Sequence, residues 1–314
     1  MAAVLSALLP IFALIALGLH LRRSGLIPEP HWASIERLCF WALFPALLLT
    51  TLARTAPPSG EAARLALALV MMMLGMAALS LASRRVLVRA LGIGDAAYTT
   101  LFQAGVRWHG FVALAVVLNL HGEAAVALVA VGLAALAPIG NASAVAILAR
   151  YGDRAGAAPA SFGGVLRQIA LNPVIWACAA GIGLNLAGIG LWPPVEAFLD
   201  LLGRAALGLG MLAIGAALSV RAALRPSGAA LVGVALKLVA APALALFLCV
   251  VLSVDGLARE VALICAAVPM AANGFVLARE MGGDAALYAT TMTLQTAAAL
   301  VALPVWIWIA RATG

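Results

Sequence analysis

Charged residues are scarce in this chain, and that scarcity indicates the solvent in which it folds. Asp, Glu, Lys and Arg together make up 10% of the 314 residues, whereas hydrophobic residues make up 65% and the mean hydropathy is +1.13. A soluble domain of this length could not cover its surface with so few polar groups. The composition therefore excludes a soluble globule and predicts a polytopic membrane protein.

Cysteine and histidine are also few, and their spacing excludes several kinds of site. The four cysteines lie in apolar segments without CxxC spacing, and the four histidines form no cluster along the sequence. The sequence also lacks a phosphate-binding glycine loop, a GxSxG nucleophile elbow, and an acid, base and nucleophile at a common membrane depth. We therefore expect neither an enzyme nor a bound metal or other cofactor.

Long apolar segments take the place of the missing polar residues. A bilayer core of roughly 30 Å needs about 20 residues per helix, and runs such as residues 65–82 lack the alternation of β-barrel strands. An all-α polytopic membrane protein is predicted. No basic residue precedes the first segment, so we expect it to remain as a span and not to be cleaved as a signal peptide. The ten candidate spans are residues 2–20, 33–53, 65–83, 95–120, 123–148, 165–187, 198–219, 228–252, 258–280 and 287–310.

Basic residues gather on one side of these spans. Of the 19 Lys and Arg residues, eleven lie in the loops that follow the odd-numbered spans, and four lie on the opposite face. By the positive-inside rule the arginine-rich face is cytoplasmic and both termini are periplasmic. This topology accounts for the net charge of +7, and arginines spread over five short loops do not favour nucleic acid as a partner. An Ala-rich helical chain without a targeting segment favours the inner membrane of a bacterium, with the lipid bilayer as its partner.

A short motif recurs at matching places in two spans. His109-Gly110-Phe111 returns as Asn273-Gly274-Phe275, and at nearly the same offset Pro10, Gly18 and Gly25 return as Pro173, Gly181 and Gly188. Because each half would hold five spans, an odd number, the second half must enter the membrane from the opposite face. We predict two inverted five-helix repeats, residues 1–155 and 165–314, joined by a short cytoplasmic linker at residues 156–164.

The recurring motif lies where Gly or Pro interrupts an apolar span. Pro269 removes one backbone hydrogen bond and clashes with the preceding turn, so it leaves carbonyl groups free near the middle of the ninth span. In lipid such groups are tolerated only where they are buried in protein or line a wet cavity. Secondary transporters bind solutes at matched interruptions of this kind. We predict a solute site at Pro269 and Asn273, with a simple proline kink as the alternative.

Two basic residues lie deep in the predicted spans, whereas no Asp or Glu lies in the middle of any span. Arg107 and Lys237 occupy the fourth and eighth spans, at a depth where a charge costs at least ~2.5 kcal/mol and faces protein or water. Each could bind a substrate charge or satisfy loose backbone carbonyls. A cation exchanger would be expected to carry a buried carboxylate, so positive charge at depth favours an organic anion as the substrate.

The remaining candidates are polar residues close to the interruptions. An imidazole with an unperturbed pKa changes its charge near neutral pH, which makes His109 a candidate for proton coupling. The alternative is that His109 is a neutral hydrogen-bond donor. Asn141 follows Pro138 and Gly140 and could face the site or join helices, and for Gln295 we favour the interhelical role. The candidate substrate-binding residues are Asn273, His109, Gly110, Gly274, Asn141 and Pro269, and the candidate charge or coupling residues are Arg107, Lys237 and His109, with H+ or Na+ as the coupling ion.

The chain resembles the auxin efflux carrier family over nearly its whole length. The resemblance implies a bacterial member of ten helices in two inverted repeats, with broken, crossing helices 4 and 9, similar to bile-acid symporters and sodium/proton antiporters. Where the family pattern usually carries Asn, this chain has His109. The matching stretches are Leu9-Pro10, Phe44-Pro45-Ala46-Leu47, Val106-Arg107-Trp108, Pro138-Ile139-Gly140-Asn141, Asn172-Pro173, Lys237-Leu238 with Pro242, Val268-Pro269 and Leu303-Pro304.

These observations lead to one favoured function and one alternative. The favoured function is a secondary carrier that moves a small organic anion, such as a carboxylate, across the inner membrane by alternating access. The alternative is a sensor or receptor subunit that binds the same ligand without transport, although the loops are short for an output domain. The resemblance implies short carboxylates such as malonate or malate as solutes, helices 1, 2, 6 and 7 as a scaffold, and a homodimer through those helices.

Overall fold

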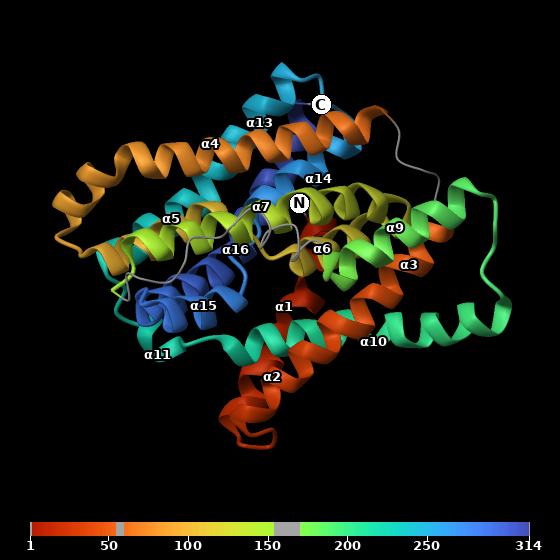
Figure 1. Ribbon diagram of the computed structural model, residues 1–314, viewed down its shortest axis with the longest axis horizontal. Helices are drawn as coiled ribbons and strands as arrows, with labels where there is room; N and C mark the ends of the chain where they lie inside the picture. Colours follow the sequence, from red (N-terminus) through yellow and green to blue (C-terminus); the bar gives the residue numbers. More distant parts are fainter. Residues whose placement is uncertain (1, 55–59, 154–169, 314) are drawn as a thin grey trace.

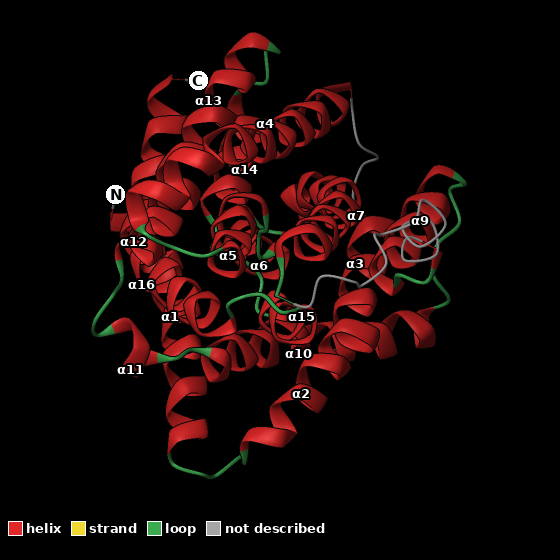
Figure 2. Cartoon of the chain, turned by 60° about the vertical axis from the view of Figure 1, so that its left-hand side comes forward, coloured by secondary structure: helices red, strands yellow, loops and turns green. Residues whose placement is uncertain are grey.

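The structure, a computed structural model, describes residues 2–54, 60–153 and 170–313. Over these residues the chain is helical and contains no strand, which confirms the all-α prediction (Figures 1 and 2). Eight helical segments are long and apolar enough to cross a membrane, and Pro173–Leu186 is a shorter apolar helix. Each predicted span overlaps a helix or a pair of helices. The predicted linker lies outside the described residues, and the inverted repeat stays a prediction.

The helices of the first half follow the predicted spans closely, because apolar runs in lipid must satisfy their backbone groups within the segment. In chain order they are α1 (Ala2–Arg23), α2 (Glu29–Leu38), a π-helical turn η1 (Cys39–Leu43), α3 (Phe44–Arg54), α4 (Gly60–Leu91), α5 (Asp95–Val106), α6 (Gly110–His121), a 3-10 turn η2 (Glu123–Ala125) and α7 (Val126–Tyr151).

The second half begins with a capped helix. Asn172 accepts a hydrogen bond from the Val174 N–H at 2.9 Å, and Pro173 takes the first helical position, so Asn172 caps this helix. The elements are α9 (Pro173–Leu186), α10 (Pro193–Ala217), α11 (Val220–Ala223), α12 (Gly228–Ala235), the π-helical turn η3 (Leu236–Ala240), α13 (Ala241–Val251), α14 (Gly256–Ala267), α15 (Asn273–Met281) and α16 (Ala285–Thr313).

Both π-helical turns lie just before a proline inside a long span. Pro45 follows η1 and Pro242 follows η3, and a proline in a helix cannot bond the carbonyl four residues earlier. A widened turn moves that carbonyl away from the ring. For Pro242 the freed carbonyl belongs to Leu238, and it accepts a hydrogen bond from Nε1 of Trp306 at 2.8 Å.

The helices form two packed groups. In the first, α1 packs mainly against α10, and α3 packs against α9 and α10 (Figure 1). Glycines permit the close approach: a side chain at Gly215 would overlap the backbone of Ile15, and one at Gly18 would overlap the backbone of Leu212. The second group holds α4 to α7 and α12 to α16, with α5 and α6 in its middle (Figure 2).

Both predicted interruptions are present in this second group. Arg107 (φ −75°, ψ 149°) ends α5, and Val268 (φ −70°, ψ 151°) ends α14, so the same extended backbone interrupts both spans. Pro269 explains the second, because a residue before proline is disfavoured in the helical region. The first has no proline. There Gly110 restarts the helix where a larger residue would overlap the side chain of Leu133.

Candidate functional site

The two interruptions contact each other through the backbone. The His109 N–H donates to the carbonyl oxygen of Pro269 at 2.8 Å. Two helices, α5 and α14, end at this contact, and two others, α6 and α15, begin beside it. The first N–H groups of α6 and α15 therefore contribute partial positive charge to one small region.

Arg107 connects the interruptions to α7. Its Nη2 donates to Oδ1 of Asn273 at 2.5 Å and to Oδ1 of Asn141 at 3.2 Å. The side chain is buried, with 5% of its surface exposed, and its Nε and Nη1 have no hydrogen-bond partner among the described residues. Three of the predicted site residues thus form one network, and two buried nitrogens of the guanidinium have no partner in it.

Tyr288 and Gly274 complete the second interruption, and Tyr288 was not identified by sequence reasoning. The Tyr288 hydroxyl donates to the carbonyl of Ala271 at 2.6 Å and lies close to the Arg107 guanidinium. A side chain on Gly274 would overlap this hydroxyl. Gly274 therefore allows the tyrosine to approach, and it does not line the cavity described below.

Gln295 has the interhelical role that we favoured for it. Its Oε1 accepts from the Met270 N–H at 2.8 Å, and its Nε2 donates to the carbonyls of Gly233 at 2.9 Å and Ala104 at 3.4 Å. The side chain is fully buried. One amide therefore ties the second interruption to the end of α5 and to α12, and it satisfies backbone groups that the interruptions leave free.

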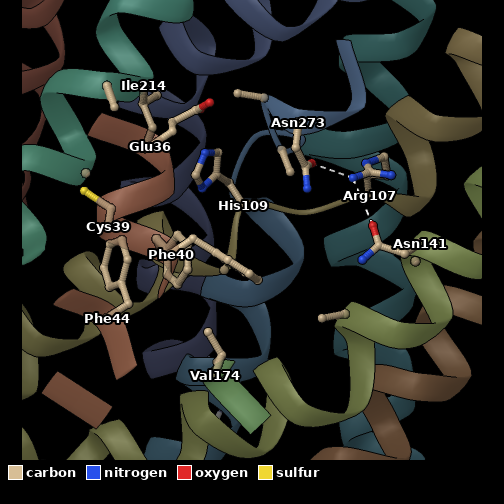
Figure 3. Close-up of a pocket in the computed structure, with 18 of the residues that line it drawn as sticks. Glu36, Cys39, Phe40, Phe44, Arg107, His109, Asn141, Val174, Ile214 and Asn273 are labelled. Atoms are coloured by element: carbon tan, nitrogen blue, oxygen red, sulfur yellow. Dashed lines mark hydrogen bonds between the residues drawn. The ribbon is translucent and has the colours of Figure 1, made fainter. Parts of the chain in front are cut away.

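A cavity of about 610 Å³ lies between the two groups of helices (Figure 3). Its size is that of a site for a small molecule. One side is formed by α2, η1, α9 and α10, and the other by the two interruptions and α7. Among the predicted site residues, those that line it are Arg107, His109, Gly110, Asn141 and Asn273, whereas Gly274, Pro269 and Lys237 are not among its lining residues.

Aromatic side chains supply much of the apolar wall. Phe40, Phe44, Trp108 and Phe111 all line the cavity. The rings of Phe44 and Phe111 are stacked, with centroids 3.5 Å apart and planes 2° from parallel. Because Phe44 belongs to the first group of helices and Phe111 to the second, this stack joins the two groups beside the site.

Glu36 is a cavity residue that the sequence did not single out. It lines the cavity from α2, and Figure 3 shows it on the side of the cavity opposite to Arg107. It forms no salt bridge or hydrogen bond with any described residue. The spacing of Glu36, Phe40 and Phe44 places all three on one helical face, and this pattern could have revealed it.

The described residues that line the cavity carry charges of both signs. Glu36 and Glu280 are acidic, and Arg37 and Arg107 are basic. His109 adds a ring whose Nδ1 has no hydrogen-bond partner in the described part of the chain. The expectation of purely positive charge around the site was therefore incomplete, because it considered only residues in the middle of spans.

Lys237 lies away from these residues. It occupies η3, only 1% of its surface is exposed, and Cys265 of α14 is its electrostatic neighbour. No described carboxylate forms a salt bridge with it. Its predicted role in charge or coupling stays a prediction.

The cavity extends from the middle of the molecule toward the arginine-rich ends of the helices. Its lining includes Ala33 and Arg37 of α2, which is the first part of the second span, the capping Asn172 of α9, and Glu280 near the end of α15. At the opposite ends, Nδ2 of Asn119 in α6 donates to the carbonyl of Ala7 in α1. His121, Glu260 and Arg311 form an ion-paired cluster on that same side.

Comparison with known proteins adds one match. Residues 159–307 match the model of a family described as membrane transport protein. No curated protein matches the chain. The matched range holds the second interruption, with Pro269, Asn273 and Gly274, and it also includes Lys237 and Gln295.

Proposed function

We propose that the chain, whose residues 159–307 match the membrane transport protein family, is a secondary carrier for a small organic anion such as a carboxylate. The observation that carries this proposal is the cavity at the two interruptions, where Arg107 is held by Asn141 and Asn273. A guanidinium with unused donors suits a carboxylate, which can accept two hydrogen bonds from it.

The surroundings of Arg107 support an anion at this point. The N-terminal ends of α6 and α15 adjoin the cavity through Gly110 and Asn273, and a helix N-terminus favours negative charge. His109 is the proposed coupling residue if the carrier uses H+; Na+ is the other candidate ion. Pro269 acts here by breaking the helix and by accepting the backbone hydrogen bond of His109.

The two packed groups of helices suggest how the carrier works. We propose that α1, α2, α3, α9 and α10 form the scaffold and that the other group, with its two crossing interruptions, moves against it in alternating access. The cavity lies between the groups, as this mechanism requires. In this proposal the protein lies in a bacterial inner membrane with periplasmic termini, the conformation faces the cytoplasm, and a homodimer forms through the scaffold.

Uptake into proteoliposomes tests the carrier directly. We expect labelled malonate, malate or an indole acid to accumulate under an imposed H+ or Na+ gradient, and Asn273→Ala to abolish this uptake because it removes the acceptor of Arg107. The control is Asn185→Ala, whose side chain bonds the carbonyl of Ala53 away from the cavity. Saturable binding with no uptake under any gradient would indicate that the protein is a ligand-binding sensor and not a carrier.

A further inference from the structure

The cavity offers binding groups of both signs, one from each group of helices. Glu36 belongs to α2, and its carboxylate has no salt bridge or hydrogen bond with the described residues. Arg107 belongs to the first interruption, and its Nε and Nη1 also lack partners there. In Figure 3 Glu36 and Arg107 lie on opposite sides of the cavity, and they form no salt bridge with each other.

A ligand with only a negative charge would pair with Arg107 and would offer no partner to Glu36. Binding a carboxylate at Arg107 would still leave the Glu36 carboxylate, which is exposed and lines the same cavity, without a partner of opposite charge among the described residues. Among the described lining residues, Arg37 and Arg107 are basic and Glu36 and Glu280 are acidic. A cavity with charges of both signs suits a ligand that carries one charge of each sign.

The wall between the two charges is apolar. Phe40 and Phe44 follow Glu36 on the same face of the second span, and Phe111 stacks on Phe44. This wall can cover an aliphatic or aromatic side chain, because flat rings bury apolar surface and contribute no charge of their own.

We propose that the solute is a zwitterion of the amino-acid type, with its carboxylate on Arg107, its ammonium on Glu36 and its apolar side chain against the phenylalanines. The inference rests on the proposed function of the same cavity and narrows the carboxylate to one that also bears an ammonium group. Each charged end then meets an opposite charge, and a hydrogen bond between charged groups is stronger than one between neutral groups.

Three ligands of nearly the same shape separate this inference from the broader carrier proposal. Binding to the purified full-length protein is measured by calorimetry for phenylalanine, for 3-phenylpropionate, which lacks the ammonium, and for phenethylamine, which lacks the carboxylate. We expect phenylalanine to bind at least ~10-fold more tightly than either analogue, because each analogue leaves one charge of the cavity unpaired.

The variant Glu36→Gln assigns the ammonium site. We expect it to weaken phenylalanine at least ~10-fold and to leave 3-phenylpropionate unchanged or slightly tighter, since only the ammonium loses its partner. Glu29→Gln is the matched control, because Glu29 lies on the same helix and is not among the cavity residues; it should leave all three affinities unchanged.

The outcomes distinguish the two proposals. Equal or tighter binding of 3-phenylpropionate to the unaltered protein overturns the zwitterion and leaves a carrier of simple carboxylates in place. The zwitterion is likewise overturned if phenylalanine, leucine and alanine all fail to bind while malonate or malate is taken up. Discrimination that survives in Glu36→Gln also overturns the assignment of the ammonium to this residue.

Discussion

At the scale of single residues, the geometry of the Arg107 guanidinium should matter more than its charge. One nitrogen bonds both Asn141 and Asn273, and the two others are buried without a hydrogen-bond partner among the described residues. Lysine keeps the charge but has a single ammonium and no planar fork. We expect Arg107→Lys to lower carboxylate uptake at least ~10-fold with little change in Tm. Arg204→Lys in α10, which is not among the cavity residues, is the control; full activity of Arg107→Lys would contradict this role.

Lys237 permits a second prediction that separates stability from transport. Its ammonium is buried and forms no salt bridge or hydrogen bond with the described residues. No such interaction therefore offsets the free-energy cost of its desolvation. Methionine has a similar length and no charge. We expect Lys237→Met to keep or raise Tm in thermal unfolding while gradient-driven uptake falls. A clear loss of Tm would instead indicate that the ammonium stabilises the fold.

The residues that sequence reasoning found and missed differ in a physical way. Arg107, Asn141 and Asn273 were identifiable because charge, proline or a repeated motif marks them in an apolar span. Glu36 and Tyr288 carry no such mark. Their roles depend on tertiary packing, which brings α2 to the cavity and the start of α16 to the second interruption.

At the scale of elements, the side chain of Gln295 permits a prediction because it joins three separate segments. Leucine at this position would leave the Met270 N–H and the carbonyls of Gly233 and Ala104 without their partner. We expect Gln295→Leu to lower the free energy of unfolding by about 1–3 kcal/mol per group left unsatisfied. Thr296→Val is the control, since its hydroxyl bonds only the Met292 carbonyl of its own helix, and thermal unfolding should show a much smaller loss.

The contact between α1 and α10 gives a prediction with a control in the same helix. A Cβ at Gly215 would overlap the backbone of Ile15, whereas a Cβ at Gly208 would meet nothing within 4 Å. We expect Gly215→Ala to destabilise the protein by about 1–3 kcal/mol, because it forces the helices apart. Gly208→Ala should be neutral or stabilising in the same unfolding experiment, because alanine is the better helix former. Equal effects of both changes would show that close packing of the helices does not explain why Gly215 is a glycine.

The interruptions show how well the position of a helix break can be predicted from sequence. Pro269 was enough to place the break between α14 and α15, because proline restricts the residue before it. The break between α5 and α6 has no proline and was inferred from the repeated motif. Its position depends on contacts of Gly110 with α7, and such contacts between distant segments are not encoded in local propensity.

At the scale of the whole molecule, the direction in which the cavity opens can be tested by chemical access. Ala137 lines the cavity in its middle, and the lining continues to the arginine-rich ends of α2, α9 and α15. In a variant without native cysteines, we expect a charged, impermeant thiol reagent to label Ala137→Cys from the arginine-rich face and to label it poorly from the other. The hydrogen bond from Asn119 to Ala7 joins the two groups at the closed end, so adding Asn119→Ala should increase labelling from that end. Labelling from the closed end alone would contradict the inward-facing assignment, and an unchanged ratio with Asn119→Ala would show that this contact does not keep that end closed.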